Sequence, residues 1–290
     1  MAYFIMKLFS KIICLLPVRF SRKIGDLIGS ITWYIVPQRR KLMAFRNVKL
    51  SLKLSDAESY QITKQSWTRF GRMIVEVMRF PKILPQIQSY VKIVGRENLD
   101  EALALGRGAI IATAHSGNWE LLGAALATNK YPLIAVAKKQ NNGNMDRLIN
   151  EYRTLAGQHV TYKTGVREMV RFLGEGKIIG LLMDQDAGSD GVILDFFGRK
   201  ASCAQGAAFL GRLKNAPILP TFITENPDGT HTITVGKMLW VTETAKKHDD
   251  IANMTNLLIQ KIEEHVRRYP SEWFWLHNRW KYTDKIGLND

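Results

Sequence analysis

Two residues of the sequence have the types and the spacing of an acid–base pair, His115 and Glu120. A carboxylate that accepts a hydrogen bond from an imidazole fixes its tautomer and stabilises the imidazolium. The other ring nitrogen can then take a proton from a hydroxyl group. We therefore interpret His115 as a general base oriented by Glu120, for a reaction in which the substrate supplies the hydroxyl. The alternative is a packed histidine at a strand end and a glutamate that only stabilises a helix N-terminus.

The elements expected on either side of this pair bring its two members together. Residues 109–114 form a short apolar run typical of a buried strand, and residues 119–128 are typical of a helix capped by Ser116 or Asn118. The histidine then ends the strand, the glutamate lies in the first helical turn, and the chain reverses between them.

Four short boxes resemble those of a known enzyme family. Residues 115–120 have the sequence HSGNWE, which resembles the H-x4-[DE] box of glycerolipid-type acyltransferases. This form is similar to the branch that adds secondary acyl chains to lipid A in Gram-negative bacteria, the lauroyl and myristoyl acyltransferases. Similar boxes follow in the family's order at 133–149, 179–188 and 195–202.

The resemblance implies roles for five further residues. Lys138 stands where the family usually has an arginine, and it is a candidate to hold a phosphate as a point charge. Asp184 lies in the acidic box and is expected to organise the site around this cation and the acceptor. Arg199 is a candidate for a phosphate of the acceptor or of the donor's phosphopantetheine. Backbone N–H groups near Gly117, with Asn118, are candidates to bind the substrate and the oxyanion.

The acidic residues that follow the apolar run at 178–183 are also compatible with a calcium-binding loop. Its four carboxylates are those of Asp184, Asp186, Asp190 and Asp195. The loop fails the EF-hand pattern because Ser189 replaces the glycine of the sharp turn and because a predicted strand, not a helix, precedes it. We therefore predict no metal. The resemblance also implies an acyl thioester as the donor, which needs no further activation, so we predict no cofactor.

Strand and helix signals alternate along most of the chain. Examples are an expected strand at 178–183, a helix at 203–214, a late strand at 230–241 and a long helix at 249–268. This alternation predicts an α/β fold, with a mainly parallel central sheet flanked by helices on both faces. His277 follows the last of these elements without an acidic partner at catalytic spacing, and we interpret it as structural.

The N-terminal segment differs in composition from the rest of the chain. The protein has 41 Lys and Arg against 26 Asp and Glu, a net charge of +15 over 290 residues. Residues 1–53 hold eleven of these basic residues and one acidic residue, so +10 of the charge lies there. Such an excess requires an anionic partner or surface. The two cysteines are far apart and suggest neither a disulfide framework nor a zinc site, as is usual in a reducing compartment.

Apolar runs at 3–20 and 27–36 lie among these basic residues, and three consecutive basic residues, 39–41, follow the second. The uncharged run is too short to span a bilayer comfortably, and no cleavage site of a secretory signal peptide follows it. We predict a membrane-associating helical segment over 1–53 that lies on an anionic membrane surface, followed by an acyltransferase domain over 54–290. A packed helical hairpin is the alternative for the segment.

Taken with the resemblance, these features predict an acyltransferase at the cytoplasmic face of the inner membrane. It would transfer a fatty acyl chain from acyl carrier protein to a hydroxyl of a lipid A precursor. Two alternatives stay open. One is an acyltransferase for another membrane glycolipid or a lysophospholipid. The other is a non-catalytic basic protein that binds membranes; no nucleic-acid-binding module is recognisable, so nucleic acid is not an expected partner.

Overall fold

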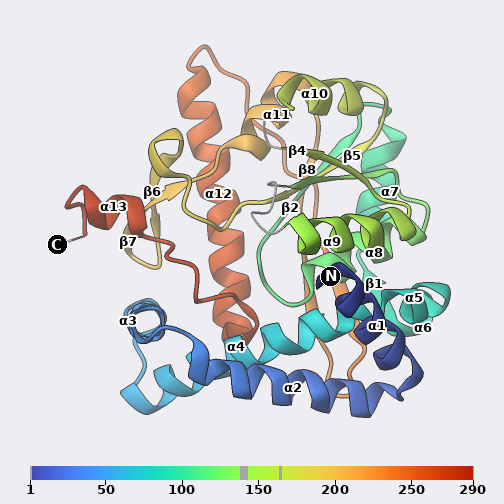
Figure 1. Ribbon diagram of the computed structural model, residues 1–290. Coiled ribbons are helices and arrows are strands. Elements are labelled where there is room, and N and C mark those ends of the chain that lie inside the picture. The colour runs from blue at the N-terminus through green and yellow to red at the C-terminus, as the bar shows by residue number, and fades with distance from the viewer. Residues whose placement is uncertain (1, 138–142, 163–164, 290) are drawn as a thin grey trace.

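A computed structural model describes residues 2–137, 143–162 and 165–289 (Figure 1). The centre of the molecule is a seven-stranded sheet with the strand order β1-β9-β8-β2-β5-β3-β4. Its strands are β1 (Val91–Val94), β2 (Ala109–Thr113), β3 (Leu133–Ala137), β4 (His159–Tyr162), β5 (Ile178–Leu182), β8 (Ile218–Glu225) and β9 (His231–Val235).

The predicted α/β class with a mostly parallel sheet is confirmed. Strands β8, β2, β5, β3 and β4 pair in parallel, whereas β9 runs antiparallel to β8 and β1 runs parallel to β9. The antiparallel step follows from the short connection between β8 and β9, because a crossover to a parallel neighbour needs a dozen or more residues.

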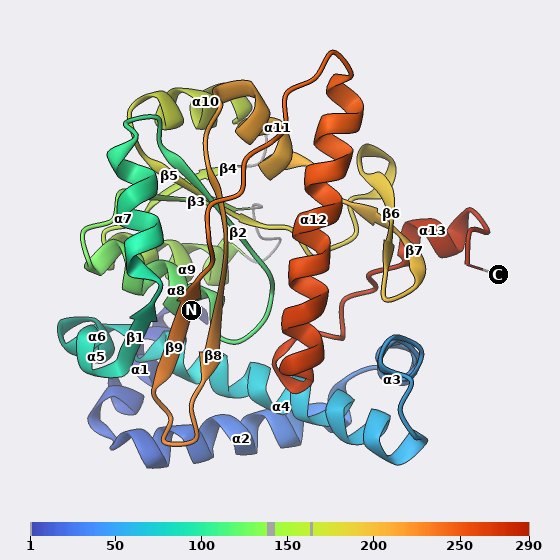
Figure 2. The ribbon, with the colours of Figure 1, turned by 180° about the vertical axis from the view of Figure 1, so that it is seen from behind.

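Helices cover both faces of the sheet, as the two opposite views in Figures 1 and 2 show. Alternate residues of β2 point to the two faces. Ile110 and Ala112 join the core formed with α10, α11 and α12, and Ala109 and Ile111 join the core formed with α7, α8 and α9. The bounds are α7 (Arg96–Ala104), α8 (Trp119–Thr128), α9 (Gly143–Leu155), α10 (Val166–Gly174), α11 (Gly206–Lys214) and α12 (Lys247–Arg268).

A two-stranded hairpin, β6 (Val192–Phe196) and β7 (Arg199–Cys203), was missing from the sequence-based prediction. Its turn is Phe197-Gly198, and both residues have positive φ, at 56° and 72°. Two-residue hairpin turns with this backbone normally carry Asn or Gly at the first position. Because a phenylalanine stands there, the usual turn signal is absent, and the predicted helix at 203–214 begins only at Gly206.

The N-terminal segment is helical and forms three helices, α1 (Ala2–Leu15), α2 (Val18–Ile35) and α3 (Gln38–Leu52). Helix α2 lies along α4 (Asp56–Met78), which begins with a capping box between Ser55 and Glu58. Short helical pieces complete the chain: α5 (Phe80–Ile83), α6 (Ile87–Tyr90), α13 (Lys281–Lys285) and three 3₁₀ turns at 84–86, 188–190 and 270–272. Among the described residues, no helix combines the length and apolar character needed to cross a bilayer.

Glycines allow α2 and α4 to approach closely. A Cβ atom added at Gly29 would lie 2.7 Å from the Thr68 backbone, and one added at Gly71 would lie 2.7 Å from Gly29 Cα. The ion pair between Arg72 and Asp26, at 2.6 Å, closes the same interface. The N-terminal segment is therefore packed against the helix that follows it, and its removal would uncover the face of α4.

Gly29→Ala is expected to lower the free energy of unfolding by about 1–3 kcal/mol, because the added methyl group meets backbone atoms that cannot move aside easily. Urea denaturation followed by circular dichroism measures this change. Gly174→Ala is the matched control, since the nearest atom to an added Cβ there is the flexible end of Lys214, 3.8 Å away. Equal stability of the two variants would contradict the close crossing.

Candidate active site

The carboxyl ends of two neighbouring parallel strands bring His115 and Asp184 together. Thr113 of β2 and Leu182 of β5 are register partners, and each of the two polar residues follows its strand by two positions. His115 Nδ1 lies 2.8 Å from Asp184 Oδ1. The other carboxylate oxygen accepts a hydrogen bond of 2.7 Å from Trp273 Nε1.

Asp184 is a buried carboxylate whose charge is stabilised by its partners. Burial would raise its pKa, but the opposing charge and hydrogen bond of His115, with the Trp273 N–H, lower the pKa of Asp184 to about 2. An ionised carboxylate only accepts hydrogen bonds, so the proton of the neutral imidazole is on Nδ1. The Nε2 atom is left with its lone pair, and the Gln185 amide lies 3.4 Å from it.

Glu120 does not form the predicted pair with His115. Its two carboxylate oxygens accept hydrogen bonds from Arg153 of α9, at 2.7 and 2.9 Å. Helix α8 carries this side chain toward α9, whereas the histidine faces the end of β5. The observed partner of the imidazole is therefore Asp184, from a box 69 residues away in the sequence. The signal that relates them is their common position after adjacent strands, which emerges only once the strand order is known.

The turn between β2 and α8 is held by the segment after α12. The Gly117 N–H donates to the Glu272 carbonyl at 3.1 Å, and the Phe274 N–H donates to the His115 carbonyl at 3.0 Å. Gly117 has φ +61°, and an added Cβ atom would lie 2.3 Å from the Ile223 carbonyl oxygen, so a glycine is required there. The predicted oxyanion donor at Gly117 is thus already engaged within the protein.

Asn118 has a structural role that its prediction as a substrate-binding residue did not include. It is buried and is the N-cap of α8, with Oδ1 accepting from the Leu121 N–H at 3.0 Å. Its Nδ2 donates to Glu76 at 3.0 Å. Of the two caps that the sequence allowed, the structure therefore selects Asn118 over Ser116.

A groove with a volume of about 610 Å³ begins at His115 and runs between α4 and α9. Its polar residues lie at the His115 end and along the α9 wall: His115, Glu120, Asp146, Arg153 and Gln185. The remaining lining is mostly apolar and includes Phe70, Met73, Ile74, Val77, Leu148, Ile149 and Phe274. The Trp119 ring packs edge-on against the His115 ring, with centroids 5.0 Å apart. A groove of this kind suits a long alkyl chain whose reacting end lies beside the imidazole.

The two predicted phosphate-binding cations are placed differently. Lys138 lies outside the described residues. Arg199 is largely buried and links three elements: it donates to Asn47 at 3.1 Å, pairs with Asp284 at 3.2 Å and stacks over Trp280. Burial lowers the pKa of Arg199. Its observed contacts give it a structural role, and a contact with substrate phosphate stays a prediction.

The carboxylates that the sequence places in one acidic loop have separate partners in the structure. Asp184 faces His115, and the exposed Asp195 pairs with Lys200 at 3.0 Å. His277 Nε2 accepts the backbone N–H of Asp186 at 3.1 Å, and burial lowers the pKa of His277 to about 4, which keeps it neutral. No group of three potential metal ligands forms within the described parts of the chain.

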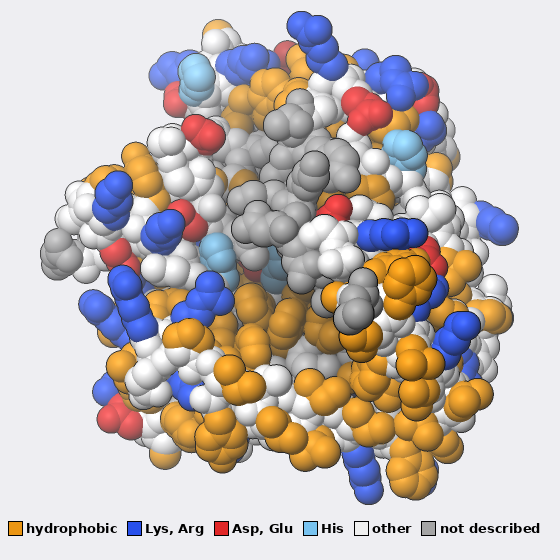
Figure 3. Space-filling view, in the orientation of Figure 1, with side chains coloured by type: hydrophobic (Ala, Val, Ile, Leu, Met, Phe, Trp, Pro, Cys, Tyr) orange, Lys and Arg blue, Asp and Glu red, His pale blue; other side chains and the backbone are white. Residues whose placement is uncertain are grey.

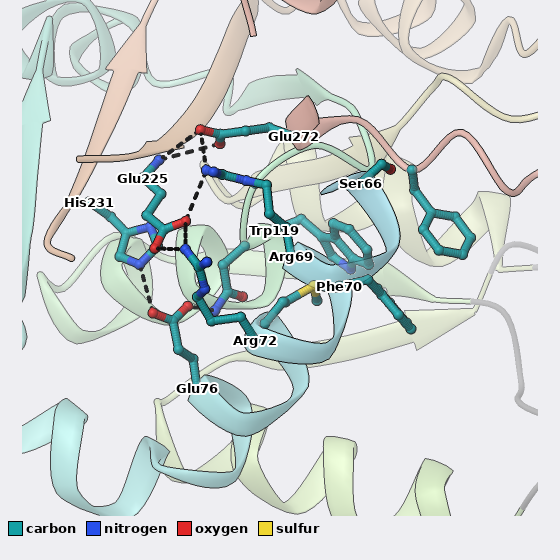
Figure 4. Close-up of a pocket in the computed structure, with 13 residues that line it drawn as sticks. Ser66, Arg69, Phe70, Arg72, Glu76, Trp119, Glu225, His231 and Glu272 are labelled. Atoms are coloured by element: carbon teal, nitrogen blue, oxygen red, sulfur yellow. Dashed lines mark hydrogen bonds and ion pairs between the residues drawn. The ribbon is translucent and has the colours of Figure 1, made fainter. Parts of the chain in front are cut away.

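A network of partly buried charges lies behind the turn that carries His115 (Figure 4). Arg69 of α4 pairs with Glu272 at 2.7 Å and with Glu225 at 2.9 Å, and Arg72 pairs with Glu225 at 2.7 Å. The Glu272 carbonyl is the acceptor for the Gly117 N–H. The network thus ties α4 and the end of β8 to the turn that carries the histidine.

The sequence is similar to those of known acyltransferases. The model of the bacterial lipid A biosynthesis acyltransferase family matches residues 1–282. A phosphatidylinositol mannoside acyltransferase of Mycolicibacterium smegmatis is 26% identical over 225 residues, which are 76% of this chain and 72% of that protein. A lipid A biosynthesis acyltransferase of Shigella flexneri is 23% identical over 269 residues, 91% and 85% of the two chains.

Among solved structures, the 1-acyl-sn-glycerophosphate acyltransferase PlsC of Thermotoga maritima covers 83% of this chain and 98% of its own, at 12% identity. Its TM-score of 0.36 is too low to support an inference. The family model, in contrast, extends over nearly the whole chain and includes every box of the site. The chain therefore belongs to the bacterial lipid A biosynthesis acyltransferase family, and it is an acyltransferase whose acceptor is a lipid.

Proposed function

We propose that the protein transfers a fatty acyl chain from acyl carrier protein to a hydroxyl of a lipid A precursor, as a lauroyl or myristoyl transferase does. The observation that carries this proposal is the His115–Asp184 pair at the head of a mainly apolar groove. The pair supplies the base for a hydroxyl, and the groove supplies space for an acyl chain.

The proposed reaction uses the imidazole nitrogen that does not face Asp184. His115 Nε2 takes the proton of the acceptor hydroxyl as its oxygen attacks the thioester carbonyl carbon. Asp184 stabilises the imidazolium that forms. Collapse of the tetrahedral intermediate breaks the carbon–sulfur bond, and the imidazolium returns the proton to the departing thiolate. The products are an ester and a free thiol.

A second acceptor class is favoured by the sequence comparison. Several of the relatives are phosphatidylinositol mannoside acyltransferases, so a mannosylated phospholipid, or another glycolipid, is the alternative acceptor. Both acceptors present a hydroxyl group on a lipid anchored in a membrane. The chemistry assigned to His115 is the same for either.

Mass spectrometry of the products distinguishes these acceptors. The purified protein is incubated in separate reactions with a lipid A precursor and with phosphatidylinositol mannoside, each with acyl carrier protein and acyl-CoA as alternative donors. Addition of one acyl chain to the lipid A precursor from the carrier protein supports the proposal. Acylation of the mannoside alone would show that the proposed acceptor is wrong. Turnover with acyl-CoA alone would show that the proposed donor is wrong.

We also propose that the protein lies on the cytoplasmic face of the inner membrane. Large apolar side chains are exposed along α1 and α2: Phe4, Ile5, Leu8, Ile12, Leu15, Phe20, Leu27, Ile31, Tyr34 and Ile35. Figure 3 shows hydrophobic side chains gathered on the lower part of the molecule, over the N-terminal helices. Basic residues flank them, as in helices that lie in the plane of an anionic membrane.

Replacing four of these exposed residues by serine, Phe4, Leu8, Leu15 and Phe20, is expected to abolish most binding to anionic vesicles, because each buried apolar side chain contributes about 1.5–3 kcal/mol. Vesicle flotation measures the bound fraction. The substitutions leave the packed faces of α1 and α2 intact, and circular dichroism checks this. Leu213→Ser with Leu155→Ser, at exposed sites on α11 and at the end of α9, is the control. Unchanged flotation of the four-residue variant would contradict the proposed surface.

A further inference from the structure

Glu76 of α4 is a buried carboxylate that lies behind the catalytic turn and is absent from the lining of the substrate groove. It accepts three side-chain hydrogen bonds: from Asn118 Nδ2 at 3.0 Å, from the Tyr90 hydroxyl at 2.9 Å and from His231 Nε2 at 3.1 Å. The bonds from Asn118 and His231 reach different oxygens of the carboxylate and together hold it in one orientation. Figure 4 shows it facing His231, at one side of the network of partly buried charges.

Glu76 and His231 stabilise each other's charged forms. Burial works against both charges, but their attraction and hydrogen bond lower the pKa of Glu76 and raise the pKa of His231. Glu76 is therefore ionised, and an ionised carboxylate can only accept hydrogen bonds.

This restriction fixes the orientation of the Asn118 amide. Its NH₂ group must face Glu76, so its oxygen faces the Leu121 N–H, which it caps at 3.0 Å. The flipped amide would place an oxygen against the carboxylate and an NH₂ group against the N–H of Leu121. Both contacts would be repulsive, so the charge of Glu76 selects the capping orientation.

The cap is close to the reacting group. Asn118 follows His115 by three residues, and the helix that it starts places Trp119 against the imidazole ring. We propose that Glu76 is a positioning residue for acyl transfer, which acts by orienting Asn118 and so fixes the start of α8 and the His115 ring. This inference rests on the proposed role of His115 as the base.

Glu76→Gln is expected to lower kcat by about 10- to 100-fold, the loss that a small misplacement of a catalytic group produces. The KM for the lipid acceptor should change little, because Glu76 does not line the groove. Asn118→Asp should cause a similar loss, since two carboxylates would then face each other.

The two substitutions together provide the decisive variant. In Glu76→Gln/Asn118→Asp, the new amide nitrogen donates to the new carboxylate at position 118, which still caps α8. The new amide oxygen still accepts from Tyr90 and His231. The double variant is expected to recover most of the lost kcat. Tyr90→Phe is the matched control, because it removes a hydrogen bond from the same carboxylate, leaves Asn118 untouched and should leave kcat close to that of the wild type.

A second measurement needs no substrate. The proton between His115 Nδ1 and Asp184 is expected to give a downfield resonance in the ¹H spectrum of the unliganded protein, assigned by its loss in His115→Ala. It should shift or broaden in Glu76→Gln and in Asn118→Asp, return in the double variant and stay unchanged in Tyr90→Phe.

Two results would overturn the inference: an unchanged resonance and kcat in folded Glu76→Gln, or a folded double variant no better than the single ones. If the wild type acylates neither acceptor, the proposed substrates are wrong, and the resonance alone tests the positioning role.

Discussion

Asp184→Asn and His115→Ala are each expected to lower kcat by about 10²- to 10⁴-fold, the range measured for general bases and for the carboxylates that orient them. In Asp184→Asn, no carboxylate selects the Nδ1–H tautomer of His115 or stabilises its imidazolium. Because the two residues act as one unit, the double variant should be little worse than His115→Ala alone. Steady-state assays with the acceptor that the mass-spectrometric test identifies provide the rates.

The pH dependence adds a check on this pair. With a pKa of about 2, Asp184 stays ionised from pH 5 to pH 9. The loss in Asp184→Asn should therefore be present throughout this range, and no ionisation of Asp184 should limit the wild-type rate there. Asp195→Asn, at an exposed site on the hairpin, is the control and should be near wild type. Losses of His115→Ala and Asp184→Asn that add in log rate would show that the two residues act separately.

The second large effect is expected at Glu120. Removing one partner of a buried ion pair typically destabilises a protein by about 3–5 kcal/mol, since the other charge stays buried. The Glu120 and Arg153 side chains are 10% and 15% exposed, so Glu120→Ala should approach the lower end of this range. Urea denaturation measures the loss. Glu120→Leu/Arg153→Met removes both charges and should be more stable than Glu120→Ala.

The same residue tests the original acid–base prediction. If Glu120 oriented the imidazole, its loss would matter little once His115 was gone. The observed pairing with Arg153 implies instead that the effects of Glu120→Ala and His115→Ala on log kcat add. A double variant no worse than His115→Ala alone would restore Glu120 as the partner of the histidine.

Sequence patterns were sufficient where local signals and long-range packing agree. The alternation of apolar runs with helical periodicity identified the central strands and the helices around them, and Asn118 is one of the two helix caps that the sequence allowed. The hairpin of β6 and β7 was missed because Phe197 adopts a backbone conformation that usually requires Asn or Gly. The direction of β9 was missed because strand pairing depends on the whole sheet.

The residues of the candidate site likewise divide into what the sequence determined and what the tertiary structure decided. Their types, and the family to which the boxes belong, were evident from the sequence: an imidazole after one strand, a carboxylate after another and an apolar surface beside them. Which carboxylate meets the imidazole was decided only by the tertiary structure. Proximity along the chain favoured Glu120, but adjacency of β2 and β5 places Asp184 there, and α9 supplies Arg153 to Glu120. Side chains pair according to which elements neighbour each other in space. The strand order determines those neighbours, and no local sequence pattern encodes the strand order.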